Sequence, residues 1–231
     1  MPTLLIRLVG PMQSWGTLSR FSIRETSTEP SKSGVIGLLC AALGKPRDQS
    51  TIDDEEFRSI ATLRMAVRVD REGIVKYDYQ TAQNIAQVSG GQPKETETSP
   101  KYYLSDACFV VGLEGKDPNL LHQLNHALKF PKWQLYLGRK AFVPSLPVSF
   151  KDELYPGNLE ESLLDLNFCS WQGIADGRKA EPPEHLRVVL EDPKGPEMRY
   201  DQPFSLSKRT FLPRYCSTKF INLKGGKYVS V

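Results

Sequence analysis

The chain has 231 residues, of which 39% are hydrophobic and 25% are charged, and its formal net charge is +3. A chain of this length and composition can bury a full core, and it forms either one large domain or one domain plus a small one. The longest apolar run, Val35–Leu43, is too short to span a membrane, so we expect a cytoplasmic protein without a membrane partner.

The first predicted element is a short strand over Thr3–Val9, which stops at Gly10-Pro11 and is followed by a polar loop. This loop carries Trp15, Arg20 and Arg24 and is rich in hydroxyl side chains up to Glu29. Arginines and hydroxyls bind phosphates, and an exposed indole ring offers a stacking face. We therefore interpret the loop as a phosphate-binding segment around an exposed Trp15.

A buried helix is predicted to follow, because Val35–Leu43 is almost wholly apolar. Ser31 or Ser33 can cap its N-terminus, and Gly44 can end it in a left-handed conformation. Lys32 stands in the first turn, where the helix dipole disfavours a cation. A phosphate bound at the helix N-terminus would explain the lysine, and the alternative is a solvated lysine beside an ordinary cap.

The pattern then predicts a surface helix over 51–63 and a hairpin of two strands, Met65–Val69 and Ile74–Tyr79, joined by a turn at Gly73. From Gln80 to Lys101 the sequence is polar and without periodicity, so we expect an insertion that projects from the fold. Strand-rich sequence returns over 102–113.

Asp117-Pro118 predicts the start of a second core helix that ends near Lys129, and a strand is expected over Trp133–Leu137. The resulting order is the βαββαβ order of a ferredoxin-like (RRM-like) fold, so the expected fold class is α+β. The proline-rich segment Val143–Val148 predicts a domain junction. We expect one domain over 1–143, with its insertion at about 80–101, and a smaller, mostly β domain over 144–231.

Positive charge is concentrated at the C-terminal end of the chain. Between Arg199 and Val231 there are seven Lys/Arg residues against one acid, Asp201, so this part carries +6 and the first 198 residues carry −3. Aromatic residues alternate with these cations, a combination that suits single-stranded nucleic acid. The alternative is a set of strands with core aromatics and solvated lysines.

Few residues could support catalysis or metal binding. The four cysteines stand singly, which argues against a zinc site and a disulfide framework. His122 and His126 have the spacing of two metal ligands on a helix, but neither an HExxH motif nor a third ligand accompanies them. The segment EPSKSG lacks the glycines of an NTPase phosphate loop. We expect no metal, no cofactor and no catalytic residue.

Three segments together resemble the CasD family, the RAMP-superfamily subunit of type I-E CRISPR Cascade complexes. They are GPMQSWG at 10–16 with the arginines after it, EPSKSGVIGLLCAALG at 29–44, and YLGRK at 136–140. The resemblance implies a ferredoxin-like domain, a thumb-like extension that touches guide RNA and a backbone subunit, and a smaller C-terminal domain. It implies a non-catalytic subunit that binds the 5′ repeat-derived handle of the guide RNA (crRNA). The implied partners are this RNA, the backbone subunit CasC and the large subunit CasA, with target DNA reached only through the complex.

The candidate RNA-binding residues combine the polar loop, the helix start, the basic turn of YLGRK and the basic tail. They are Gln13, Trp15, Arg20, Arg24, Lys32, Ser33, Arg139, Lys140, Arg209 and Arg214.

Two other functions remain open on the sequence alone. Relatives in type I-C systems cut the guide precursor with a Tyr/Lys/His site, so a metal-independent endoribonuclease is an alternative, although no Lys-His pair occurs in this chain. A protein-interaction scaffold is a third possibility, and it would have no salt-dependent affinity for RNA.

Overall fold

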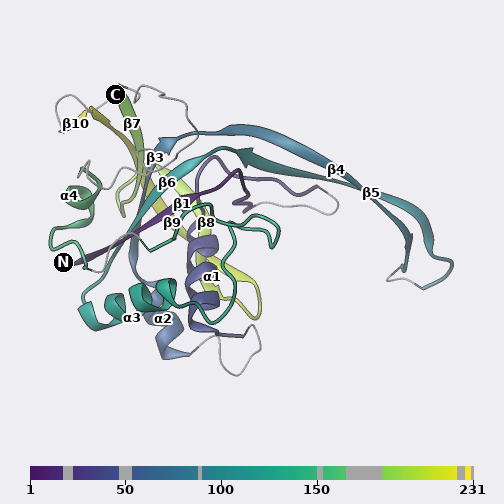
Figure 1. The fold of residues 1–231 in the computed structure, drawn as a ribbon, viewed down its shortest axis with the longest axis horizontal. Helices are drawn as coiled ribbons and strands as arrows, with labels where there is room; N and C mark the ends of the chain where they lie inside the picture. The colour runs from purple at the N-terminus through teal and green to yellow at the C-terminus, as the bar shows by residue number, and fades with distance from the viewer. Residues whose placement is uncertain are drawn as a thin grey trace.

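The structure is a computed structural model that describes residues 1–17, 23–46, 54–87, 90–149, 153–164, 184–222 and 227–229. These residues form an α+β fold with two antiparallel sheets (Figure 1). The larger sheet has the strand order β1-β6-β3-β7-β9-β10, with β8 paired to β9. Its strands are β1 (Thr3–Val9), β3 (Arg64–Arg71), β6 (Cys108–Glu114), β7 (His185–Glu191), β8 (Glu197–Ser205), β9 (Thr210–Asn222) and β10 (Lys227–Val229).

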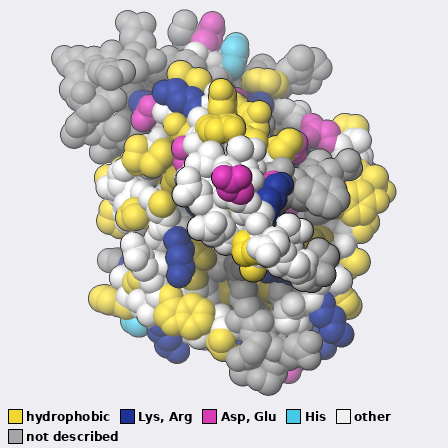
Figure 2. Space-filling model, turned by 90° about the vertical axis from the view of Figure 1, so that its right-hand side faces the viewer, with side chains coloured by type: hydrophobic (Ala, Val, Ile, Leu, Met, Phe, Trp, Pro, Cys, Tyr) yellow, Lys and Arg dark blue, Asp and Glu magenta, His cyan; other side chains and the backbone are white. Residues whose placement is uncertain are grey.

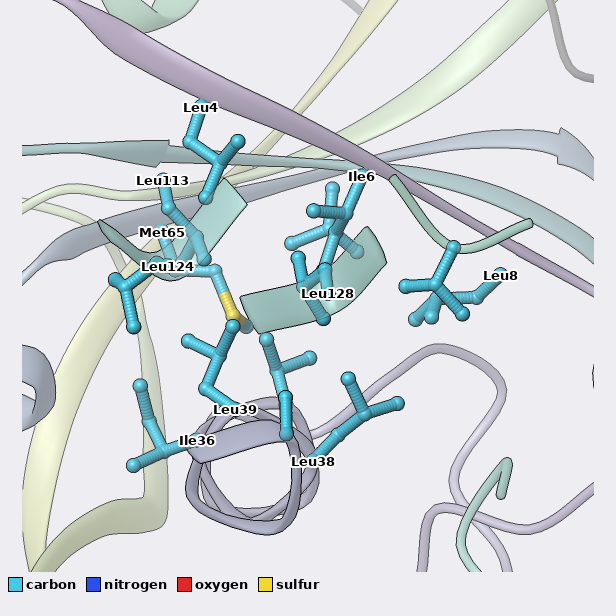
Figure 3. Packing of buried hydrophobic residues seen from close by; sticks show 14 of the residues in the cluster. Leu4, Ile6, Leu8, Ile36, Leu38, Leu39, Met65, Leu113, Leu124 and Leu128 are labelled. Carbon is cyan, nitrogen blue, oxygen red and sulfur yellow. The ribbon is translucent and has the colours of Figure 1, made fainter. Parts of the chain in front are cut away.

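The main core lies between one face of this sheet and the helices α1 (Lys32–Leu43), α2 (Glu55–Ala61) and α3 (Pro118–Lys129). Alternate residues of a strand point to the same face, so Leu4, Ile6 and Leu8 of β1 all enter this core. Figure 3 shows them facing leucines of α1 and α3. The other face of the sheet is covered by α4 (Leu159–Leu164), whose Leu159 and Leu163 are fully buried in a second cluster.

Both core helices form as the sequence predicts. Ser31 caps α1, its hydroxyl accepting a hydrogen bond from the Gly34 amide, and Gly44 ends the helix with φ +71°. Asp117 caps α3 and Pro118 occupies its first turn. The surface helix also exists, but Asp54 is its N-cap and it is shorter than the predicted 51–63. Residues 51–53 lie outside the described part of the chain.

The strand predicted at Trp133–Leu137 is wrong, because this segment is not part of either sheet. Trp133 is 45% exposed, and the Leu137 amide instead donates to the Phe142 carbonyl in a turn. The backbone beside β1 is supplied by later residues, with isolated bridges Ile6–Ser149 and Thr3–Tyr155. Two buried leucines among polar neighbours produced the strand pattern, although here they anchor a turn.

The hairpin predicted from Met65 to Tyr79 is also wrong. The turn at Gly73 exists, with φ +76°, but β3 pairs with β6 and β7, whereas β4 (Ile74–Ile85) pairs with β5 (Lys94–Ser105). The chain therefore leaves the main sheet at Gly73 and enters the smaller sheet, β2-β5-β4, in which β2 is Met12–Gln13. Adjacent strands in sequence predict a hairpin only when the turn keeps them in one sheet.

The polar insertion at 80–101 projects from the fold as expected, but it has regular structure. It forms most of a long two-stranded ribbon of β4 and β5, which extends away from the body of the molecule (Figure 1). Every residue of β4 is exposed except the partly buried Ile85. The ribbon is therefore held by its own ladder of hydrogen bonds rather than by a core.

The later strands extend the first sheet instead of forming a separate one. β7 pairs with β3 in a continuous register from Ala66–Leu190 to Val69–Arg187. Hydrogen bonding thus runs across the predicted division at residues 143/144, and this division stays a prediction. Among the helices of the described residues, none is long and apolar enough to cross a membrane.

Candidate nucleic-acid interface

A pocket of about 340 Å³ lies where the loop after β2, the start of α1 and the turn between β8 and β9 meet. We call it the arginine pocket, because three arginines from distant parts of the chain line it. Its lining residues are Ser14, Trp15, Gly16, Arg24, Glu25, Ser31, Ser33, Gly34, Gly138, Arg139, Leu206, Arg209 and Phe211. Five of the ten candidate RNA-binding residues, Trp15, Arg24, Ser33, Arg139 and Arg209, are therefore brought together.

Arg24 is fixed by the base of the ribbon. Its amide donates to the Pro100 carbonyl at 3.0 Å, and its carbonyl accepts from the Tyr102 amide at 2.8 Å. These bonds make a parallel bridge between Arg24 and Lys101, so the loop runs alongside β5. The backbone of Arg24 is held, while its side chain is exposed.

Arg139 is positioned by the same backbone. Its Nη2 donates to the Arg24 carbonyl at 3.2 Å and to the Tyr102 carbonyl at 2.8 Å. Burial of the guanidinium lowers the pKa of Arg139, and the charge of Asp78 opposes this shift. The guanidinium remains cationic, because an arginine pKa stays far above neutral pH.

Gly138 allows this turn to approach the loop closely. It has φ +90°, and a Cβ at this position would lie 1.7 Å from the Ser14 carbonyl oxygen. The Ser14 amide donates to the Leu137 carbonyl at 3.1 Å, which joins the two segments. Any side chain at 138 would therefore separate the turn from the loop and displace Arg139.

Arg209 lies in the turn between β8 and β9, with φ +53°, and its side chain is exposed. Within the described parts of the chain, neither Arg24 nor Arg209 forms an ion pair. Three guanidiniums thus line the pocket against the single carboxylate of Glu25. A surplus of cations with free N–H groups suits a phosphate, since guanidinium binds phosphate with paired hydrogen bonds.

The expectation of an exposed Trp15 is wrong, because its side chain is only 1% exposed. Its ring packs on Gly34 of α1, where an added Cβ would lie 2.9 Å from a ring carbon. Its Nε1 donates to Gln13 Oε1 at 3.1 Å, and Gln13 Nε2 donates to the carbonyls of Leu8 and Ala107. Trp15 therefore forms a wall of the pocket, and Gln13 is a buried support for it.

Lys32 does not enter the pocket, contrary to the sequence-based interpretation. Its side chain is 1% exposed, and its Nζ lies 2.8 Å from Glu191 Oε2. The N-terminus of α1 does hold an anion, but this anion is the carboxylate of Asp201, which accepts from the Lys32 amide at 2.7 Å. Burial lowers the pKa of Lys32, and Glu191 only partly offsets it. The charge at this helix start is compensated within the protein.

Arg214 is also buried and paired with an acid. It is 6% exposed, and its Nε and Nη2 lie 2.5 and 2.9 Å from the two oxygens of Asp201. Burial alone would lower the pKa of Arg214, but the hydrogen bonds and the charge of Asp201 raise it. Arg214 therefore supports the sheet beneath α1 and is not presented to a ligand.

The other two candidates lie apart from this set. Lys140 is exposed next to Arg139 but does not line the pocket. Arg20 lies outside the described residues. Three lining residues, Glu25, Leu206 and Phe211, lie outside the motifs that sequence reasoning singled out, although Phe211 stands two residues after Arg209 in the basic, aromatic tail that indicated nucleic acid.

The histidines lie elsewhere. His122 and His126 are exposed on α3, where the His126 ring contacts Phe130 at 5.1 Å between centroids, and His185 is exposed at the start of β7. None of them lines the arginine pocket. A larger hollow of about 710 Å³, between α3 and residues 144–149, contains none of the ten candidate residues.

Figure 2 views the molecule from the side on which the ribbon projects. On this face the Lys and Arg side chains occur as separate patches among neutral and hydrophobic surface, rather than as one basic band. The described part of this face therefore does not present a continuous basic surface of the kind that binds duplex nucleic acid. The clearest local surplus of positive charge among the described residues is in the arginine pocket, which three arginines and one glutamate line.

The chain is similar to known CRISPR-associated proteins. Residues 3–216 match the family described as CRISPR-associated protein (Cas_Cas5). The chain is 32% identical over 239 residues to the CRISPR system Cascade subunit CasD of Escherichia coli (strain K12), and the match covers 98% of each chain. It also resembles the structure described as a crystal structure of Cas protein, with 40% identity, 96% coverage of each chain and a TM-score of 0.73. A chain of a CRISPR RNA-guided surveillance complex is 27% identical, with a TM-score of 0.72 and 96% and 90% coverage of the two chains.

Proposed function

The chain belongs to the Cas_Cas5 family of CRISPR-associated proteins, and from this premise we propose that it is the CasD subunit of a Cascade surveillance complex that serves antiviral defence. In this role it binds the 5′ repeat-derived handle of the guide RNA and leaves the RNA intact. The observation that supports this proposal is the arginine pocket, in which Arg24, Arg139 and Arg209 converge at the base of the ribbon.

The pocket suits the end of a single RNA strand. Its volume of about 340 Å³ accommodates one or two phosphate groups with their sugars, but not a duplex. Phosphate contacts to arginine fix position without reading sequence. Ser31 and Ser33 add hydroxyl groups at the start of α1.

The placement of the ionisable groups supports binding without cleavage. Metal-independent ribonucleases need a general base and a general acid within hydrogen-bond reach of the reacting groups. The three histidines do not line the pocket. The charged and hydroxyl side chains that line it are those of three arginines, three serines and Glu25. Arginine is a poor proton donor because its pKa is far above neutral pH.

The remaining elements then take roles in assembly. We infer that β1, α1, β3, β6 and α3, with the segment that bridges β1 at Ser149, form a variant of the ferredoxin-like RAMP domain. The ribbon of β4 and β5 is its thumb-like extension, which contacts the guide RNA and the backbone subunit CasC. The large subunit CasA is a further partner, and target DNA is reached only through the complex.

An assay with labelled repeat RNA distinguishes binding from cleavage. The purified protein is incubated with single-stranded RNA of the repeat in chelator, and the RNA is examined on native and denaturing gels. We expect a shifted complex whose RNA remains full length. Cleavage at one position, lost on substitution of Tyr136, His122, His126 or His185, would support the endoribonuclease instead.

A further inference from the structure

A second pocket of about 450 Å³ adjoins the arginine pocket. Ser31 lines both pockets, so they share a wall at the start of α1. We call it the hydroxyl pocket, because five of its lining residues are serine or threonine. The lining residues are Thr17, Thr26, Ser27, Thr28, Glu29, Ser31, Met198, Arg199, Tyr200 and Asp201.

The charged groups of the hydroxyl pocket are already compensated. Glu29 is 4% exposed and forms ion pairs with Arg187 and Arg199, and the Thr28 hydroxyl donates to it at 2.6 Å. Arg199 also contacts Glu197 at 2.8 Å. Burial raises the pKa of Glu29, but the hydrogen bond from Thr28 and the two arginines lower it overall, so the carboxylate stays ionised.

This balance argues against a phosphate in the hydroxyl pocket. A phosphate there would meet two carboxylates, Glu29 and Asp201, and one guanidinium, Arg199, that is paired with acids. Burying an additional anion beside carboxylates is unfavourable. The arginine pocket, with three cations against one acid, has the opposite preference. Two adjoining pockets thus differ in the kind of group that they can hold.

The groups that remain available are neutral. Tyr200 is 57% exposed and Met198 is 50% exposed, and both lie on β8 at the rim of the pocket. Among the residues that the structure describes, the hydroxyls of Thr17, Ser27 and Tyr200 have no hydrogen-bond partner. An aromatic face beside free hydroxyl groups is the combination that binds an unpaired nucleobase, by stacking and by hydrogen bonds to its edges.

We propose that the hydroxyl pocket holds one nucleobase of the RNA strand whose phosphate lies in the arginine pocket, with Tyr200 as its stacking partner. This inference rests on the proposed function, because it needs RNA in the arginine pocket. The shared wall at Ser31 places the two sites next to each other, as the phosphate and base of neighbouring nucleotides require. The hydroxyl pocket then makes the affinity depend on whether a base is present at that position and on which base it is. The arginines contribute the salt-dependent part of the affinity.

An abasic scan tests the assignment. Affinities of the wild type and of Tyr200→Ala are measured for single-stranded repeat RNA and for versions that each lack one base. For the wild type, we expect one position near the 5′ end at which loss of the base weakens binding about tenfold, the size of one stacking contact. Tyr200→Ala should weaken binding of intact RNA by a similar factor and should lose no further affinity at that position.

Three controls make the result specific. Phe204→Ala removes a ring that is 63% exposed on the same strand but does not line either pocket, so it should bind like the wild type. Tyr200→Phe retains the stacking face and should retain most of the affinity. The salt dependence of binding should be unchanged in Tyr200→Ala, since no phosphate contact is lost.

The two proposals fail in different ways. If the wild type shows no salt-dependent affinity for the RNA, the proposed function is wrong. If the wild type binds but Tyr200→Ala has wild-type affinity, the hydroxyl pocket does not hold a base. The same conclusion follows if the loss of affinity caused by Tyr200→Ala adds to the loss caused by every abasic site.

Discussion

Lys32 occupies a position that is unfavourable in an isolated helix but is stabilised by acids from distant strands. A lysine in the first turn of a helix is unfavourable unless an anion lies nearby. The anion is Asp201 at the helix amide, with Glu191 at the ammonium group, and both acids stand more than 150 residues after Lys32 in the sequence. The sequence predicts that an anion is needed, but it cannot identify one that is so distant along the chain.

We predict that Lys32→Met destabilises the fold and leaves RNA binding unchanged. Methionine keeps much of the apolar stem, but Glu191 loses its nearest cation. Among the described residues it then keeps one cation, Arg214 at 3.7 Å, and the Met65 amide, which donates to it at 3.3 Å. Breaking a buried ion pair from one side costs up to several kcal/mol, and because Glu191 is partly exposed we expect about 2 kcal/mol. Urea unfolding measures this change.

The double variant Lys32→Met, Glu191→Gln is the matched control. Removal of both charges should restore part of the lost stability, because no carboxylate is then left without its lysine partner. If Lys32→Met keeps wild-type stability but lowers the salt dependence of RNA binding, Lys32 reaches a phosphate as the sequence alone indicates.

At the scale of elements, the helices were predictable and the small sheet was not. Caps and apolar runs are local signals, and Ser31, Gly44 and Asp117 all act as they predict. The ribbon has almost no buried residues, so the usual alternation of apolar and polar residues is absent. Thr96 and Thr98 alternate with Glu95 and Glu97, which is a weak signal for a strand because threonine favours strands. The polar composition of the whole segment made a loop the more obvious prediction.

We predict that the outer part of the ribbon is dispensable for folding but needed for assembly. Gln80 pairs with Ser99, so residues 81–98 can be replaced by a two-residue Asn-Gly turn without a change of register. Because the removed residues are largely exposed, the free energy of unfolding should change by less than about 1 kcal/mol. Co-purification with CasC and guide RNA should be strongly reduced.

The position of the deletion matters. A deletion over 82–101, which the sequence alone would recommend, also removes Pro100 and Lys101, where β5 holds Arg24. That longer deletion should weaken RNA binding by the free protein, whereas the 81–98 replacement should not. Normal assembly of the 81–98 variant would show that the ribbon is not an assembly element.

At the scale of the whole molecule, the candidate site depends on long-range folding. Arg24, Arg139 and Arg209 come from three segments that are each separated by at least 70 residues, yet they line one pocket. The sequence identified all three as candidates, because Arg24 lies in the polar loop that also carries Trp15, whereas Arg139 and Arg209 each stand beside a lysine in a turn. It could not separate them from Lys32 and Arg214, because only burial and pairing distinguish a cation that is available from one that is not.

The salt dependence of RNA binding tests this account most directly. Affinity for single-stranded repeat RNA is measured across a range of salt concentrations for the wild type, for Arg24→Ala, Arg139→Ala and Arg209→Ala, and for the exposed Arg58→Ala on α2 as a control that does not line the pocket. Each pocket variant should bind more weakly and reduce the slope of log K against log salt by about 0.7, one phosphate contact on a single strand, while Arg58→Ala should match the wild type. Wild-type affinity and slope in all three pocket variants would contradict the central claim that the arginine pocket holds the RNA.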